Sequence, residues 1–173
     1  MQAGHEITLE DAHPATENIG PVAGDDIVAQ FGFAKGIHAT FLSRAKNRES
    51  AEPWGIELIG TKASFKILME MVPRIYTLND GNWTPQGKTI DWRLWEQDPT
   101  LKWGESEPGF ARANERVVND WLDAISQDRE PVSSGYAGMK ALEMAMGVFA
   151  AGLARGRVTF PLKDRNHPLI PDR

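Results

Sequence analysis

Residues 25–44 read DDIVAQFGFAKGIHATFLSR, and this stretch decides the fold class. Apolar residues recur at every second position on both sides of Lys35-Gly36. This pattern is typical of two half-buried strands joined by a short turn. We therefore predict a β-hairpin in which residues of one parity share a face. The residues of that parity are Ile27, Ala29, Phe31 and Phe33 before the turn and Ile37, Ala39, Phe41 and Ser43 after it.

Further strands are expected on the C-terminal side of the hairpin, at residues 56–59, 64–69 and 74–78. Gly60-Thr61-Lys62 and Asn79-Asp80-Gly81 supply turn residues between and after them. Roughly six to eight strands of ordinary length fit before Pro99. On the N-terminal side, residues 9–24 are expected to connect a short first strand to the hairpin.

The spacing of apolar residues becomes helical after residue 109. A first stripe runs from Phe110 to Ile125 and predicts an amphipathic helix. A second stripe runs from Tyr136 to Leu153, with Ser133 or Ser134 as its N-cap and Arg155-Gly156 as its end. A last strand is expected at residues 157–162, followed by an extended tail with prolines.

Strands followed by helices predict an α+β fold, in which a large, mostly antiparallel sheet carries helices on one face. We expect one domain over 1–173: an entry strand and loop at 1–23, the sheet at 24–98, two helices at 109–156, and the last strand and tail at 157–173. Because apolar residues occur at both parities, the second sheet face is expected to need a cover from another domain or subunit.

Composition excludes several classes of function. The 173 residues are 41% hydrophobic and 25% charged, which is normal for a folded domain. A net charge of -5 argues against a nucleic-acid partner, and the absence of cysteine excludes disulfides and thiolate zinc sites. The N-terminus has no signal-peptide pattern, and no stretch is expected to reach membrane-spanning length. We expect a cytoplasmic protein with no membrane partner.

Four stretches in this order resemble the C-terminal domain of the glucose-fructose oxidoreductase and inositol dehydrogenase (Gfo/Idh/MocA) family. They are 25–36, Thr40-Phe41-Leu42-Ser43-Arg44, Ile56-Glu57-Leu58-Ile59-Gly60-Thr61-Lys62-Ala63-Ser64, and the helical region ending in Gly156-Arg157-Val158-Thr159-Phe160-Pro161-Leu162. The resemblance implies a sheet domain that lines the substrate site with one face and makes the subunit interface. It also implies NAD or NADP as cofactor of the parent enzyme, bound by an N-terminal Rossmann domain.

The sequence departs from the rest of that family pattern. No glycine-rich strand-turn-helix is present, and no lysine precedes a proline as in the family's catalytic Lys-Pro element. None of the four histidines has an aspartate four residues before it, although the family pairs a catalytic Asp and His in this way. We therefore expect no catalytic residue, no bound cofactor and no metal in this chain, and no activity without the missing Rossmann domain.

Three residues are candidates for contact with substrate: Arg44, Trp54 and His38. The resemblance implies that the end of the second hairpin strand and the loop after it, residues 45–54, face the substrate. A guanidinium there suits a carboxylate, a phosphate or sugar hydroxyls, and the alternative is a surface ion pair. His38 is equally consistent with an ordinary surface imidazole.

Other groups favour structural roles. Tyr76 and four tryptophans at 83, 92, 95 and 103 suit a core or subunit interface better than a sugar platform. His5 and His13 match no zinc spacing. Asp25 and Asp26 are adjacent on a strand and so point to opposite faces, which argues against a shared acid-base role and leaves Asp25 as a turn cap.

Two functions remain open from the sequence. The first is the substrate-side and oligomerisation domain of an NAD(P)-dependent oxidoreductase that acts on a sugar, cyclitol or related polyol. The alternative is a free-standing, non-catalytic homo-oligomer or small-ligand-binding module with the same fold.

Overall fold

The computed structural model describes residues 1–16, 20–45, 54–69, 73–78, 91–95 and 109–170. The chain divides into two compact units. Unit 1 contains Met1–Ser50 and Ser133–Arg173, and unit 2 contains Ala51–Val132.

The β-hairpin of unit 1 has the predicted pairing. Strands β3 (Asp26–Gly32) and β4 (His38–Arg44) are antiparallel, and Ile27 pairs with Ser43, Ala29 with Phe41 and Phe31 with Ala39. The turn contains the short 3-10 helix η2 (Ala34–Gly36), in which Lys35 and Gly36 both have positive φ. The Phe33 N–H closes the turn by donating to the Ile37 carbonyl at 2.8 Å. The alternation in residues 25–44 thus predicted both strands and their shared face.

The entry segment contains more structure than the long connection expected from the sequence. It contains the 3-10 helix η1 (Leu9–Asp11) and a small ladder between β1 (His13–Pro14) and β2 (Pro21–Val22). An isolated bridge joins Gln2 to His5. The segment ends at the hairpin, where Gly24 has φ 94° and its N–H donates to the Gln2 side chain at 2.9 Å.

Helix α2 (Gly135–Ala154) gives unit 1 its packing surface. Of the two predicted N-cap candidates, Ser133 and Ser134, it is Ser134 that caps the helix, and it accepts a hydrogen bond from the Ala137 N–H at 3.2 Å. The residue that follows the helix, Arg155, has a left-handed backbone conformation with φ 50°. The sequence favoured Gly156 for this conformation. Gly147 is buried in α2 where it meets the ring of Phe160, and that ring lies 6.4 Å from the ring of Phe31.

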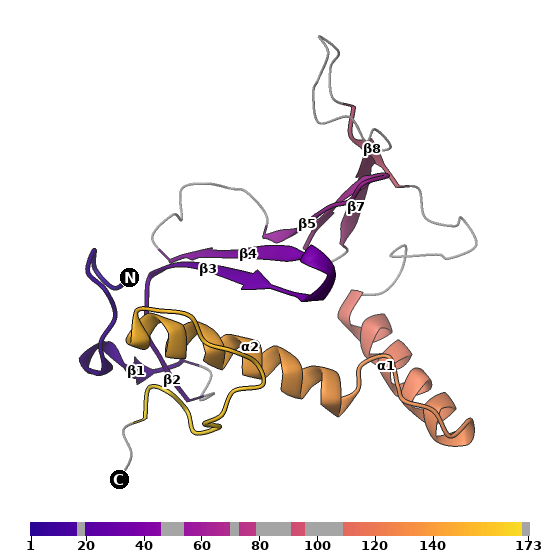
Figure 1. The fold of residues 1–173 in the computed structure, drawn as a ribbon. Coiled ribbons are helices and arrows are strands. Elements are labelled where there is room, and N and C mark those ends of the chain that lie inside the picture. The colour runs from indigo at the N-terminus through magenta and orange to yellow at the C-terminus, as the bar shows by residue number, and fades with distance from the viewer. Residues whose placement is uncertain (17–19, 46–53, 70–72, 79–90, 96–108, 171–173) are drawn as a thin grey trace. The chain divides into compact units, whose positions relative to one another are not determined.

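The segment after α2 corrects one prediction. Residues 157–162 form no strand, although each of them except Pro161 has a backbone N–H that could pair in a β-ladder. Pro161 has no N–H to donate, and the Leu162 N–H donates to Glu143 Oε1 on α2 at 2.9 Å. The segment therefore binds the helix through a side chain, and Figure 1 shows it in yellow running back along α2.

Helix α2 also corrects the expectation about membrane-spanning length. It is 20 residues long, and a window within it has a mean hydropathy of 1.2, which is enough by length and composition to cross a membrane. The core helix of a globular protein meets the same criterion. Gly147 lies against Phe160 and Gly152 against Ile7, although only 6% of the window is buried.

Unit 2 contains a four-stranded antiparallel sheet in the order β5-β6-β7-β8. Its strands are β5 (Gly55–Ile59), β6 (Ser64–Leu68), β7 (Arg74–Leu78) and β8 (Arg93–Leu94). The three strands expected at 56–59, 64–69 and 74–78 are therefore confirmed to within one residue at each end. The register places Glu57, Lys66 and Tyr76 in one row across the sheet, and Leu58, Phe65 and Thr77 in the next row on the other face.

Unit 2 ends in helix α1 (Gly109–Ser126), close to the predicted bounds. Large apolar side chains of this helix are exposed at Val117, Val118, Trp121, Leu122 and Ile125, whereas Ala124 is buried. The turn after it is closed by Asp120, which accepts from Arg129 Nη2 at 2.8 Å and from the Val132 N–H at 2.7 Å.

The elements together confirm an α+β fold with antiparallel pairing. Eight strands precede Pro99 in the described part of the chain, but β1, β2 and β8 are only two residues long, shorter than the ordinary strands expected. Their hydrogen bonds form three separate sheets there, β1-β2, β3-β4 and β5-β6-β7-β8, where the sequence analysis expected one large sheet.

Candidate functional site

The outer face of the β3-β4 hairpin carries the predicted substrate contact Arg44. Register pairs Arg44 with Asp26, and the Arg44 Nε lies 3.4 Å from Asp26 Oδ1. The Arg44 side chain is 58% exposed and that of Asp26 is 46% exposed. A guanidinium has five N–H donors, so one carboxylate contact leaves donors for an incoming oxygen ligand.

Arg44 belongs to an open surface with an apolar centre. Val28 pairs with Leu42 two residues along the ladder from Asp26 and Arg44, so all four residues share one face. Val28 is 60% exposed and Leu42 is 63% exposed. The result is an exposed apolar pair beside a salt-bridged guanidinium, which suits a ligand with both C–H surface and oxygen atoms.

His38 lies on the same face as Arg44 but at the opposite end of β4. Both are exposed, and their even numbers place them on one side of the strand. Six residues of antiparallel strand span roughly 20 Å. A single small ligand therefore cannot contact both side chains, and the structure does not bring these two predicted site residues together.

Trp54, the third predicted residue, belongs to unit 2. Its side chain is 74% exposed, and its carbonyl accepts from the Met69 N–H at 2.8 Å just before β5 begins. The loop predicted to face the substrate lies outside the described residues from 46 to 53. Trp83 and Trp103 also lie outside them, while Lys66 Nζ sits 4.8 Å above the ring of Trp92.

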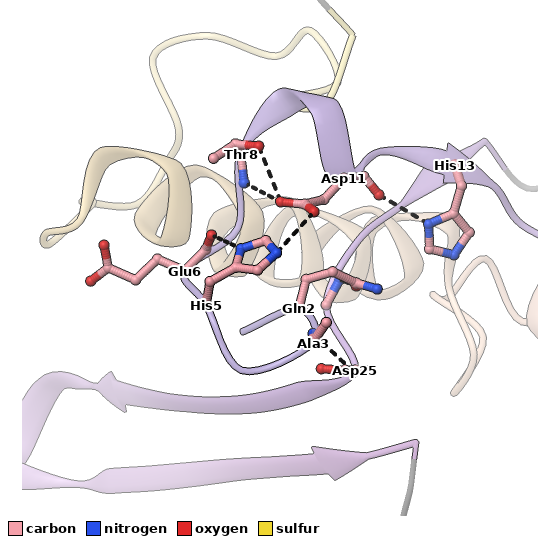
Figure 2. A network of polar contacts seen from close by, with 9 residues as sticks. Gln2, Ala3, His5, Glu6, Thr8, Asp11, His13 and Asp25 are labelled. Carbon is pink, nitrogen blue, oxygen red and sulfur yellow. Dashed lines mark hydrogen bonds and ion pairs between the residues drawn. The ribbon is translucent and has the colours of Figure 1, made fainter.

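A polar network holds the entry segment, as Figure 2 shows. Asp11 accepts from the Thr8 N–H at 2.7 Å and from the Thr8 hydroxyl at 3.1 Å, and its other oxygen lies 3.7 Å from His5 Nε2. The Thr8 backbone N–H is the main reason that the pKa of Asp11 is lower than usual. Nδ1 of His13 lies 3.0 Å from the Asp11 carbonyl.

This network stabilises local structure around the start of the hairpin. Asp25 Oδ2 accepts from the Ala3 N–H at 3.1 Å, 22 positions before it in the chain, so this contact joins two distant segments and does not cap a local turn. Within the described ranges, no three His, Cys, Asp or Glu side chains are grouped closely enough to hold a metal ion. The spacing of Thr8 and Asp11, a threonine and a carboxylate three residues apart, is the sequence signal that would have predicted this contact.

A cavity of about 350 Å³ lies next to the start of β3 in unit 1. Its apolar lining residues include Ile27 from β3 and Val148 from α2. Glu6 and Arg155 line it as well, and Arg155 Nε lies 2.9 Å from Glu6 Oε2. Sequence analysis missed this cavity because its residues come from segments far apart in the chain.

The fold and the site define an antiparallel α+β domain with an open surface, and its described residues include no group of His, Cys, Asp and Glu that could hold a metal ion. Residues 4–159 match the family model described as the oxidoreductase family, C-terminal alpha/beta domain. The chain therefore belongs to the Gfo/Idh/MocA oxidoreductase family, as its C-terminal domain. No curated protein and no solved structure gives a significant match.

Proposed function

We propose that this domain forms the substrate-side wall of an NAD(P)-dependent oxidoreductase, with the outer face of the β3-β4 hairpin as its substrate surface. One observation carries the proposal. In a domain of this family, the exposed Arg44 lies on the same hairpin face as the exposed apolar residues Val28 and Leu42, and next to them. Unlike a lid or a flexible loop, a two-stranded ladder holds these groups in fixed register.

The proposed substrates are sugars, cyclitols and related polyols. Such molecules combine hydroxyl oxygens, which accept hydrogen bonds from a guanidinium, with C–H faces that pack against aliphatic side chains. When bound, the nicotinamide supplies the hydride chemistry. The contribution of this chain is to bind and orient the substrate, and in the proposal a Rossmann domain outside it binds the NAD or NADP.

We also propose that the domain mediates homo-oligomer formation. Large apolar side chains are exposed on β5, where Ile56 is 54%, Leu58 is 52% and Ile59 is 59% exposed. Strands with apolar residues on both faces gain stability when a second copy covers one face, because apolar area leaves water.

Two parallel titrations of the purified chain test the substrate-wall proposal. In the first, NADH and NADPH are added while ligand fluorescence and melting temperature are followed, and neither is expected to change, since binding to the native state would raise the melting temperature. In the second, a cyclitol and a hexose are titrated while backbone amide NMR signals are recorded. We expect weak, saturable shifts at residues 26–28 and 42–44.

Either titration can contradict part of the proposal. Saturable nicotinamide binding by the chain would contradict a purely substrate-side role. Polyol shifts that are absent from the hairpin but present elsewhere would move the ligand surface and leave the family membership unaffected.

A further inference from the structure

A second cavity in unit 1, of about 550 Å³, lies along the C-terminal segment. Ala150 of α2, Leu9 of η1 and Ile170 contribute apolar walls. The polar lining comes mainly from the segment after α2, including Arg157 and Lys163. This cavity shares no lining residue with the cavity beside β3.

The wall formed by the C-terminal segment is held to α2 at several points although it has no regular secondary structure. Glu143 accepts from the Leu162 N–H, and its side chain is only 10% exposed. The His167 ring stacks on Phe149 with centroids 6.1 Å apart, and Leu169 is 2% exposed. These contacts give the cavity a defined wall.

A hydrogen bond inside this wall orients the His167 ring. Nδ1 of His167 accepts from the Leu169 N–H at 3.2 Å, so in the neutral ring the proton is on Nε2. Nδ1 of His167 is therefore hydrogen-bonded within the C-terminal segment, and the Nε2–H group is the donor of the neutral ring.

Charge in the cavity favours an anion. Neither Arg157 nor Lys163 has a hydrogen bond or ion-pair partner in the part of the chain that the structure describes. The cavity also contains Asp164, whose Oδ1 accepts from the Asn166 N–H at 2.9 Å. Two cations and one carboxylate leave a positive balance in a chain whose net charge is -5.

We propose that this cavity binds a small organic anion, with its carboxylate or phosphate group held by Arg157 and Lys163. The guanidinium offers a planar pair of donors and the ammonium a mobile point charge, which together suit either anionic group. The apolar walls would contact the hydrocarbon part of the same ligand. This site is separate from the proposed substrate surface on the hairpin and does not depend on it.

The test uses inorganic phosphate and butyrate as two separate probes. Each is titrated into the ¹⁵N-labelled chain while backbone amide signals are followed. We expect saturable shifts confined to residues 157–170 and neighbouring residues of α2 with at least one probe. A response to phosphate alone assigns a phosphate ligand, and a response to butyrate alone assigns a carboxylate.

Charge-neutralising variants make the test specific. Arg157→Gln and Lys163→Gln are each expected to weaken binding about tenfold, the effect of losing one charge-assisted hydrogen bond. Lys62→Gln removes the same charge from unit 2 and is expected to leave binding unchanged. Both cavity side chains lack partners among the described residues, so these substitutions break no contact seen there and the rest of the spectrum reports folding.

Three outcomes would overturn the proposal. They are the absence of saturable shifts with both probes, shifts that persist in the double variant Arg157→Gln with Lys163→Gln, and equal weakening by Lys62→Gln. The first would show that the cavity binds neither anion, and the others would show that general charge or other residues cause the response.

Discussion

At the scale of single residues, Arg44 combines a surface ion pair with a proposed binding role. A pair this exposed contributes at most about 1 kcal/mol to stability, so its main value is predicted to be functional. Arg44→Ala should weaken polyol binding about tenfold, by loss of charge-assisted hydrogen bonds, while the melting temperature changes little. NMR titration with the cyclitol measures the change.

The matched control for Arg44 is Arg93→Ala. Arg93 Nε also lies 3.4 Å from an aspartate, Asp91, and its side chain is 79% exposed, so the substitution removes a similar ion pair in unit 2. Ligand affinity should stay unchanged in this variant. Equal loss in both variants would mean that Arg44 acts through overall charge.

Asp120 gives a residue-scale prediction about pH. Hydrogen bonds from the Val132 N–H and Arg129 keep the pKa of Asp120 below its usual value of about 3.9. A lowered folded-state pKa means that Asp120 stabilises the fold above about pH 4, and that this contribution is lost as the pH falls through the folded-state value. Asp120→Asn should therefore lower the melting temperature at pH 7.

The pH dependence separates this effect from general helix damage. The difference in melting temperature between wild type and Asp120→Asn should narrow as the pH falls from 4.5 to 3. Asp123→Asn, one turn further along α1, should have little effect at either pH, since no side-chain contact of Asp123 occurs among the described residues. A constant difference at all pH values would rule out the proposed linkage.

At the scale of elements, α2 offers two glycines with opposite surroundings. Nothing lies within 4 Å of a Cβ added at Gly138, whereas a Cβ at Gly147 meets the Phe160 ring. Gly138→Ala should stabilise the chain by about 0.5–1 kcal/mol through helix propensity. Gly147→Ala should destabilise it, because the helix and the C-terminal segment can no longer approach as closely. Urea denaturation of both variants measures the two signs.

The two glycine substitutions control each other, because they make the same chemical change in the same helix. If both stabilise by similar amounts, the contact between α2 and Phe160 does not limit packing. If Gly147→Ala is destabilising, adding Phe160→Ala to it should cost less stability than Phe160→Ala costs in the wild-type chain. That result would show that the ring is the obstacle to the added methyl group.

At the scale of the whole molecule, exposed apolar side chains predict self-association. Ile56 and Ile59 of β5 are each more than half exposed. Sedimentation equilibrium should show at least a dimer, and Ile56→Glu should shift it toward monomer by placing a charge in an apolar interface. Thr40→Glu adds the same charge at another exposed strand position and serves as the control. A monodisperse monomer of the wild-type chain at high concentration would contradict the prediction.

The local pattern of residues predicted much of the fold. Alternation in 25–44 predicted the hairpin because strand side chains repeat every two residues, and helical spacing predicted α1 and α2 within a few residues. It also placed Arg44 at the end of its strand. The expected strand at 157–162 was wrong, because the Leu162 N–H finds Glu143, a partner 19 positions away.

By itself the sequence determined the β3-β4 hairpin, strands β5 to β7, both helices and the resemblance that the family match confirms, because each depends on residues close together in the chain. Only the tertiary structure decided which charged groups are paired and which line cavities. Arg44 is paired with Asp26, while Arg157 and Lys163 line a cavity without a partner among the described residues. The reason is that such contacts depend on how distant segments pack, and no local periodicity records that packing.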